Sequence, residues 1–432
     1  MTREEIMELV EQEDVEFIRL QFTDLYGNLK NVAVTSDQLG NVLSHKCCFD
    51  GQALYGDEFT GLDDLYLVPD LDTFVILPWR PQQGKVARFL CDIYTEDGDI
   101  CVNSPRYILK HVLDEARDKG YTFYVDPECE FFLFHADENG IPTTVTHDKA
   151  GYMDVGPIDL GENARRDMVL TLEEMGFEIE SSHHEKAPAQ HEIDFKEQEA
   201  LVSADSIVTF RSAVRSIAKR FGLHATFMPK PCEGVAGSGM HLNLSVYKDN
   251  KNIFNNRDSK LPTDEARWFI GGVMTHMNAL CAVTNPLVNS YKRLSSGFEA
   301  PKENVWSTRN ENGVARVRTR LGVDTIVELR FPDAAANPYL AIALCIKAGL
   351  EGIEKHTEPG AFAPDCYVTG EKIELLPVTL IEALAAMKED VLIKETLGEE
   401  FVSIYADKKM DEWNGFMQHV SNWEVNEYLY KM

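Results

Sequence analysis

Two glutamates separated by one residue stand at the start of an apolar run. Glu128 and Glu130 lie in Asp126-Pro127-Glu128-Cys129-Glu130, which continues directly into Phe131-Phe132-Leu133-Phe134. The apolar run predicts a buried strand, and alternation along a strand places both carboxylates on one face, about 7 Å apart. Two carboxylates beside a core repel each other and lose hydration, so a cation between them would stabilise them. Taken alone, however, the pair fits a strand with one solvated face better than an ion site.

Polar side chains recur on one face of four other strand-like segments. Five such segments in one domain predict a barrel-like sheet with a polar interior, which needs cations to compensate it. Because carboxylates dominate and a histidine adds a nitrogen ligand, the expected ion is hard, Mg²⁺ or Mn²⁺ rather than zinc. Singly, His241 fits a satisfied core histidine, and Glu185 and Glu192 fit surface residues. The polar residues of the four segments are Glu180, Glu192, His241 with Asn243 and Ser245, and Glu328 with Arg330.

Basic residues concentrate in one later stretch of the chain. Guanidinium groups are suited to carboxylates and phosphates because they bind both in a bidentate fork. Acidic ion sites together with arginines imply phosphoryl transfer from a nucleotide, although the sequence contains neither a G-x-x-x-x-G-K-[ST] loop nor a kinase-type glycine loop. When Arg318 or Arg320 is taken separately, a solvated loop explains the residue better than a binding site does. The basic residues are Lys292, Arg293, Arg309, Arg316, Arg318, Arg320 and Arg330.

Composition limits the class of protein. The 432 residues suit two or three domains, and 42 Lys plus Arg against 71 Asp plus Glu give a formal charge of −29. That charge repels nucleic acid and anionic membranes, so neither is an expected partner. The nine cysteines include no C-x-x-C pair, which suits reduced thiols. The N-terminus does not read as a signal peptide and no apolar run is long enough to span a bilayer, so a cytoplasmic location is expected.

The elements that position these residues divide into two regions. Residues 1–103 predict a small mixed domain, with a hairpin over 15–34 and strands over 73–77 and 85–93. The boundary falls at Ser104-Pro105, an N-cap followed by a proline at the first helical position. Residues 104–432 predict a larger domain in which strands and helices alternate irregularly. Its predicted helices cover 107–119, 160–175, 203–221, 264–283 and 338–353 with a helical tail from 376, and its predicted strands cover 177–180, 226–231, 240–246 and 327–331.

The motifs now identify a family. The chain resembles bacterial type I glutamine synthetases over essentially its whole length. The resemblance implies an α+β fold, with a β-grasp domain over 1–103 and a catalytic domain over 104–432 built on a curved antiparallel sheet or partial barrel with helices. It also implies a homo-oligomer, a dodecamer of two hexameric rings with active sites between neighbouring subunits. The matching motifs are Phe49-Asp50-Gly51, Pro127 to Phe132, Asp159 to Asn163, His183-His184-Glu185, Gln190-His191-Glu192, Gly237 to His241, Asn289 to Arg293 and Ala335 to Tyr339.

The resemblance further implies ATP-dependent ligation of ammonia to the γ-carboxylate of glutamate through γ-glutamyl phosphate, with two Mg²⁺ or Mn²⁺ ions per site. One ion would be held by Glu130, Glu185 and Glu192, and the other by Glu128, His241 and Glu328. Substrate binding falls to Glu130, Gly237, Arg293, Glu299 and Arg330, and nucleotide binding to Glu180, Asn243, Ser245 and Arg316. The catalytic residues implied are Asp50 from the adjacent subunit, Glu299 and Arg316.

The chain departs from the family pattern mainly around the phosphates. Glu311 and Ile326 stand where relatives carry arginines, and Arg309, Arg318 or Arg320 are candidates to replace them. Ala189 and Ala236 replace a glycine and an asparagine, and Leu294-Ser295-Ser296-Gly297 replaces a Val-Pro-Gly loop. Three functions therefore remain open: glutamine formation, γ-glutamyl ligation of another amine, and a catalytically weakened paralogue with a binding or regulatory role. Asp50 and Glu299 favour the first, whereas Glu311 and Ile326 favour the third.

Overall fold

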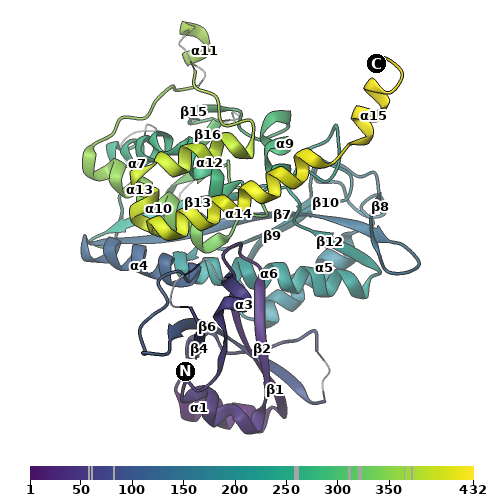
Figure 1. Cartoon of the computed structure of the whole chain (residues 1–432), viewed down its shortest axis with the longest axis vertical. Coiled ribbons are helices and arrows are strands. Elements are labelled where there is room, and N and C mark those ends of the chain that lie inside the picture. The colour runs from purple at the N-terminus through teal and green to yellow at the C-terminus, as the bar shows by residue number, and fades with distance from the viewer. Residues whose placement is uncertain are drawn as a thin grey trace.

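The computed structural model describes residues 1–56, 59, 62–80, 83–256, 262–309, 313–319, 324–363, 365–370 and 373–432. Glu311 and Arg320, named above as a departure and as a candidate replacement, lie outside these ranges. Within the described part of the chain, the strands form a six-stranded and an eleven-stranded sheet. The smaller sheet lies at the N-terminal end of the molecule, and most helices surround the larger one (Figure 1). This mixed α+β architecture is the one predicted.

The smaller sheet has the mixed pairing of a β-grasp fold. Strand β1 (Val15–Thr23) pairs antiparallel with β2 (Leu29–Thr35) and parallel with β6 (Lys85–Thr95). The predicted hairpin is confirmed, and Asp24 closes its turn by accepting the Asn28 N–H at 2.9 Å. The predicted strand over 73–77 shrinks to β5 (Val75–Ile76) because the residues before it form the 3₁₀ turn η2 (Leu71–Thr73). The remaining strands are β3 (Cys48–Asp50) and β4 (Asp64–Pro69).

The larger sheet is organised around β7 (Tyr121–Ala136), whose 16 residues pair antiparallel with several other strands. On one side β7 pairs with β13 (Met240–Lys248), and on the other with β10 (Gln190–Phe195). The sheet runs in the order β15-β16-β17-β13-β7-β10-β9, and it curls into a half-barrel. Its other strands are β8 (Pro142–Thr146), β9 (Ile179–His184), β11 (Gln198–Glu199), β12 (Leu223–Thr226), β14 (Lys251–Asn252), β15 (Glu303–Ser307), β16 (Gly313–Thr319) and β17 (Thr325–Leu329).

Helices cover the larger sheet and pack closely on one another. Helix α6 (Ala200–Arg220) packs on β7, and α10 (Pro338–Lys355) packs on α7 (Asp264–Thr275). Glycine permits the α7–α10 contact, because a Cβ on Gly272 would lie 2.0 Å from the Ala348 carbonyl oxygen. The other helices are η1 (Ser36–Gln38), α1 (Arg3–Gln12), α2 (Leu39–Leu43), α3 (Gly51–Tyr55), α4 (Pro105–Asp118), α5 (Glu162–Glu174), α8 (Met277–Thr284), α9 (Val288–Ser296), α11 (Asp365–Thr369), α12 (Leu380–Glu389), α13 (Val391–Leu397), α14 (Glu399–Gln418) and α15 (Asn422–Tyr428).

Two predicted elements of the larger domain need correction. The helix predicted over 264–283 breaks at His276, whose Nδ1 lies 2.7 Å from Asp390 and whose Nε2 lies 3.0 Å from Glu351. These contacts outside the helix hold the residue between α7 and α8. The strand predicted over 226–231 ends at Thr226, because two prolines in the following segment cannot donate backbone hydrogen bonds to a sheet.

A buried arginine joins the two regions. Arg106, at the start of α4, donates to Asp205 of α6 at 2.8 and 2.9 Å, and to Asp92 of β6 and Asp70 at 2.7 Å each. The smaller sheet is thereby tied to the helices of the larger region. All nine cysteines lie in the described ranges and are unpaired, as predicted. In the same ranges, no helix combines the length and apolar character that crossing a membrane requires.

Candidate active site

A cavity of about 420 Å³ lies against the larger sheet, where β7, β10, β13, β16 and β17 present polar side chains. All of the predicted metal-binding and substrate-binding residues line it. A larger cavity of about 1010 Å³ lies between β1, α6 and α14, but the described residues that line it include none of the predicted site residues. The predicted residues that line the smaller cavity are Glu128, Glu130, Glu185, Glu192, Gly237, His241, Arg293, Glu299, Arg316, Glu328 and Arg330.

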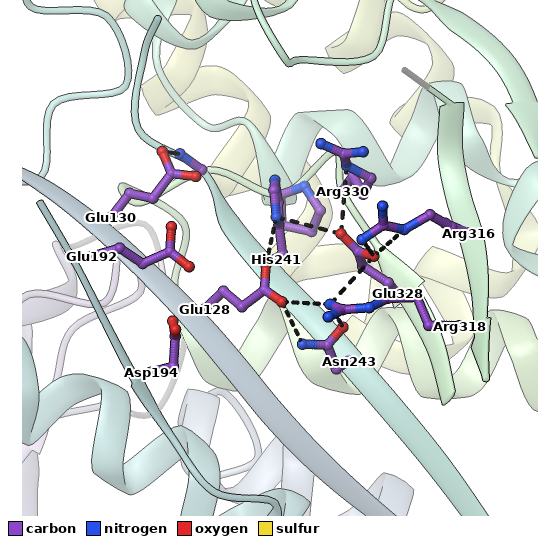
Figure 2. A network of polar contacts seen from close by, with 12 residues as sticks. Glu128, Glu130, Glu192, Asp194, His241, Asn243, Arg316, Arg318, Glu328 and Arg330 are labelled. Carbon is purple, nitrogen blue, oxygen red and sulfur yellow. Dashed lines mark hydrogen bonds and ion pairs between the residues drawn. The ribbon is translucent and has the colours of Figure 1, made fainter. Parts of the chain in front are cut away.

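Four carboxylates share one face of the β7–β10 pair. Glu130 is directly opposite Glu192, and Glu128 is opposite Asp194 (Figure 2). Burial, reinforced by the charges of Asp194 and Glu130, raises the pKa of Glu192 well above its usual range. Like charges directly opposite one another destabilise a sheet, so this face requires a compensating cation. Asp194 was not among the site residues predicted from the sequence, although it lies two residues after Glu192 and therefore on the same face of the strand.

One ligand group lies on the β9–β10 hairpin. His183, Glu185 and Glu192 each offer a ligand atom, and the three atoms lie within 4.8 Å of one another. Glu130 stands beside them, with one carboxylate oxygen fixed by the Gly239 N–H at 2.9 Å and the Gln190 amide at 2.8 Å. Of the three glutamates predicted for the first ion, the structure brings Glu185 and Glu192 together and places Glu130 on the neighbouring strand, opposite Glu192. It adds His183, whose Nε2 lies 2.9 Å from Glu185 and which the sequence reasoning did not select.

A second ligand group lies on β7, β13 and β17. Glu128, His241 and Glu328 also offer three atoms within 4.8 Å of one another. His241 Nδ1 lies 2.9 Å from Glu128 and 3.7 Å from Glu328, while its buried Nε2 has no hydrogen-bond partner among the described residues. Burial alone would raise the pKa of Glu128, but hydrogen bonds from His241 and Asn243 hold it well below its usual range. Two carboxylates and an imidazole form a donor set that suits Mg²⁺ or Mn²⁺.

Among the described residues, three guanidinium groups converge on the carboxylates of this second group (Figure 2). Arg316 lies 2.5 Å from Glu328, and the Arg330 Nε lies 3.5 Å from the other oxygen of the same carboxylate. Arg318 reaches Glu128 at 2.8 Å and Glu328 at 3.6 Å. Ile326, the departure predicted to weaken phosphate binding, lies directly opposite Arg318 in the β16–β17 pair.

Three more of the predicted substrate residues, Arg293, Gly237 and Glu299, line the same cavity. Arg293 is buried and donates to the carbonyl oxygens of Phe331 and Arg330 at 3.0 and 3.1 Å. The Gly237 carbonyl accepts the Gln190 amide at 3.1 Å. Glu299 has a φ of 57° and forms an ion pair with Lys186. The ion pair with Lys186 at the cavity lining was not foreseen from the sequence.

The residues predicted for the nucleotide divide into two sets. Asn243 is fully buried and does not line the cavity itself, but its amide donates to Glu128, which does, at 3.0 Å. Ser245 is buried outside the cavity lining and donates to Glu197. Glu180 is exposed at the irregularity where β9 meets the end of β10, also outside the lining. The structure does not bring Ser245 and Glu180 into the cavity with Arg316.

Asp50 lies away from this cavity in its own chain. It is exposed at the end of β3 and accepts the Ala53 N–H at 3.0 Å as the N-cap of α3. Two other departures fit their surroundings. Ala189 keeps a left-handed backbone with a φ of 62°, the conformation that glycine favours, and Ala236 lines the cavity. Gly297, at the end of the altered loop, caps α9 with a φ of 70°.

Comparison with known proteins gives the same family for both regions of the chain. Residues 14–96 match the family described as the glutamine synthetase beta-Grasp domain, and residues 102–428 match the glutamine synthetase catalytic domain. A glutamine synthetase from Clostridium saccharobutylicum is 50% identical over 438 residues, covering 100% of this chain and 99% of that protein. One from Staphylococcus aureus is 46% identical over 437 residues, covering 99% and 98% respectively.

Solved structures share the fold over nearly the whole chain. Ligand-free GmaS superposes with a TM-score of 0.87 at 30% identity, covering 98% of this chain and 99% of its own. A GmaS complex with ADP gives 0.88 at the same identity. Glutamine synthetase from Plasmodium falciparum gives a TM-score of 0.88 with 99% of each chain covered, and at 23% identity this likeness concerns the fold alone.

Proposed function

The chain belongs to the glutamine synthetase family, and from this premise we propose how its cavity residues carry out ATP-dependent formation of glutamine. The protein is a carbon–nitrogen ligase. Its 46–50% sequence identity with glutamine synthetases over nearly the whole chain favours ammonia over another amine as the acceptor. In the proposed reaction, the γ-carboxylate of glutamate takes the terminal phosphoryl group of ATP, giving γ-glutamyl phosphate and ADP. Ammonia then displaces phosphate and gives glutamine. The division into domains over 1–103 and 104–432 remains part of this proposal.

We assign two ion positions to the cavity. Glu130, Glu185 and Glu192 would hold one ion, with His183 adjacent, and Glu128, His241 and Glu328 would hold the other. The repulsion among the facing carboxylates of β7 and β10 supports divalent ions, Mg²⁺ or Mn²⁺, at both positions. When bound, such ions neutralise phosphoryl charge.

The remaining cavity residues bind and orient the substrates. Arg293, Arg330 and the Gly237 backbone would bind the carboxylate groups of glutamate, and Arg316 would bind the phosphates. The support is that all four residues line the same cavity as the ion ligands. Among the residues proposed to bind the nucleotide, the role of Asn243 is supported by its hydrogen bond to the ion ligand Glu128. Ser245 and Glu180 rest on the resemblance alone.

Ammonia binding requires residues beyond this cavity. Asp50 would accept a proton from ammonium in the site of an adjacent subunit, and its exposure in the smaller sheet is compatible with that role. Glu299 would close the site and stabilise the tetrahedral adduct. Members of the family form oligomers, and for this chain we propose a homododecamer of two hexameric rings. A cytoplasmic location also belongs to the proposal, and the net charge of −29 argues against nucleic-acid or membrane partners.

The clustering of six ion-ligand side chains in one cavity carries this proposal, and ADP release tests it. The protein should release ADP only when glutamate, ammonium and a divalent ion are all present. Glu328→Gln should lower the rate about 100-fold or more, because loss of even an outer-shell partner of a ligand costs about 10–100-fold. It should also remove much of the rise in unfolding temperature that Mn²⁺ produces. Glu174→Gln, on the exposed side of α5, is the matched control. Glutamate-dependent ADP release that persists in Glu328→Gln would contradict the assignment.

A further inference from the structure

Arg318 is unusual among the cavity arginines because it reaches across the curled sheet. It projects from β16, yet its Nη1 lies 2.8 Å from Glu128 of β7, although β17 and β13 separate these two strands. The same nitrogen lies 3.6 Å from Glu328. Arg318 therefore occupies carboxylate oxygens of the second ligand group, where a divalent ion would bind.

Positive charge is concentrated at this group. Among the described residues, the guanidinium groups of Arg316, Arg318 and Arg330 face the two carboxylates of Glu128 and Glu328. A divalent ion bound by these two carboxylates would add positive charge directly beside the three guanidinium groups. A guanidinium that occupies the same carboxylate oxygens must therefore leave them when the ion binds, and an anion can then accept its hydrogen bonds.

Exposure and hydrogen bonding indicate which arginine moves. The Arg318 side chain is 32% exposed, against 17% for Arg316 and 8% for Arg330. Arg316 also holds Glu328 through both Nε, at 2.6 Å, and Nη2, at 2.5 Å. Arg318 has one short contact with this group, which is the one to Glu128. It is also the guanidinium that contacts both carboxylates, so its departure frees oxygens of Glu128 and Glu328 together and returns the most exposed of the three side chains to solvent.

We propose that Arg318 is an internal counterion that neutralises Glu128 and Glu328 in the metal-free protein and moves onto the nucleotide phosphates when a divalent ion replaces it. The inference rests on the proposed function, since it takes the phosphates of ATP as the anion. The guanidinium fork suits phosphate, and Arg318 already lines the cavity. Arg318 and Ile326 are directly opposite each other. The chain thus supplies, from β16, the guanidinium that the resemblance expects at position 326 of β17.

The proposal predicts two opposite effects of one substitution, both measurable without turnover. Arg318→Gln removes a competitor from Glu128, so the assembled protein should bind Mn²⁺ about tenfold more tightly when no nucleotide is present. The same variant should bind ADP about tenfold more weakly at saturating Mn²⁺, since a charge-assisted hydrogen bond contributes roughly that factor. Titration calorimetry measures both affinities. Arg166→Gln, an exposed arginine with a side chain 68% accessible, is the matched control and should change neither.

A double variant tests the position of the guanidinium. Arg318→Gln combined with Ile326→Arg returns a guanidinium to the opposite strand, and ADP affinity should recover to within about threefold of the parent. Absence of recovery would show that a guanidinium at this pair of positions does not serve the phosphates. Weakening of both Mn²⁺ and ADP binding in Arg318→Gln, or no change in either, would overturn the counterion role. A parent protein that binds neither Mn²⁺ nor ADP would instead contradict the proposed function on which the inference rests.

Discussion

Replacing Arg106 by methionine should destabilise the protein by about 3–5 kcal/mol, the cost of breaking a buried ion pair by removing one partner. This guanidinium donates four hydrogen bonds, at 2.7 to 2.9 Å, and its three carboxylate partners differ in what remains to stabilise their charge once it is removed. Asp92 keeps Lys110 at 2.7 Å, and Asp70 is exposed enough to be hydrated. The Asp205 side chain is 11% exposed, and after the loss of Arg106 the Tyr339 hydroxyl, at 2.6 Å, is the one side-chain donor it keeps within the described part of the chain.

A double variant isolates this charge. Adding Asp205→Asn to Arg106→Met removes the uncompensated carboxylate, so it should restore about 2 kcal/mol, within the range of coupling between residues in contact. Urea unfolding of the assembled protein at one fixed concentration measures the four free energies, because assembly itself contributes to stability. Arg117→Met is the matched control: its ion pair with Asp114 is exposed and is worth about 0–1 kcal/mol. A loss below about 1 kcal/mol for Arg106→Met, or additive effects of the two substitutions, would refute the reasoning.

Three further predictions concern separate parts of the molecule. Gly239→Ala should weaken Mn²⁺ binding and raise the KM for glutamate, because the added Cβ would lie 2.7 Å from Arg293; calorimetry and steady-state kinetics measure these. Burial lowers the pKa of His276, but its two carboxylate partners outweigh burial and raise it. The stabilisation that protonated His276 provides is therefore complete below about pH 6.5, the unfolded-state pKa, and is lost as pH rises through the folded-state pKa. The difference in unfolding free energy between the parent and His276→Gln should accordingly become smaller as pH rises. Lys186→Met should change stability by less than about 0.5 kcal/mol, since its ion pair is exposed, while speeding limited proteolysis near Glu299.

The sequence predicted the parts of the site that depend on strand periodicity. Glu128 and Glu130 share a face because alternation along one strand is local, and the same rule extends to Glu192 and Asp194. The resemblance grouped Glu128 with His241 and Glu328, residues far apart in the chain, and the structure brings the three together. Local periodicity alone could not have done so, because the order of strands in the sheet decides such contacts.

What the sequence did not predict depends on contacts between distant elements. The break at His276 needs Glu351 of α10 and Asp390, the residue between α12 and α13, so helical periodicity alone predicts an unbroken helix. The contact between Arg318 and Glu128 likewise depends on the curl of the sheet, which brings together strands that are not paired. The Lys186–Glu299 ion pair joins residues from separate loops for the same reason.

The position of both ion groups on β7 has a consequence for how this chain can change over evolution. Glu128 belongs to one group and Glu130 stands beside the other, so the spacing of the two groups equals two residues of a single strand. Substitutions around the cavity leave that spacing intact, as Ile326 and Ala236 illustrate. Inserting or deleting one residue between the two glutamates would turn one of them to the opposite face of the sheet. Lineages of this protein should therefore vary in the composition of the cavity while the length of this segment stays constant.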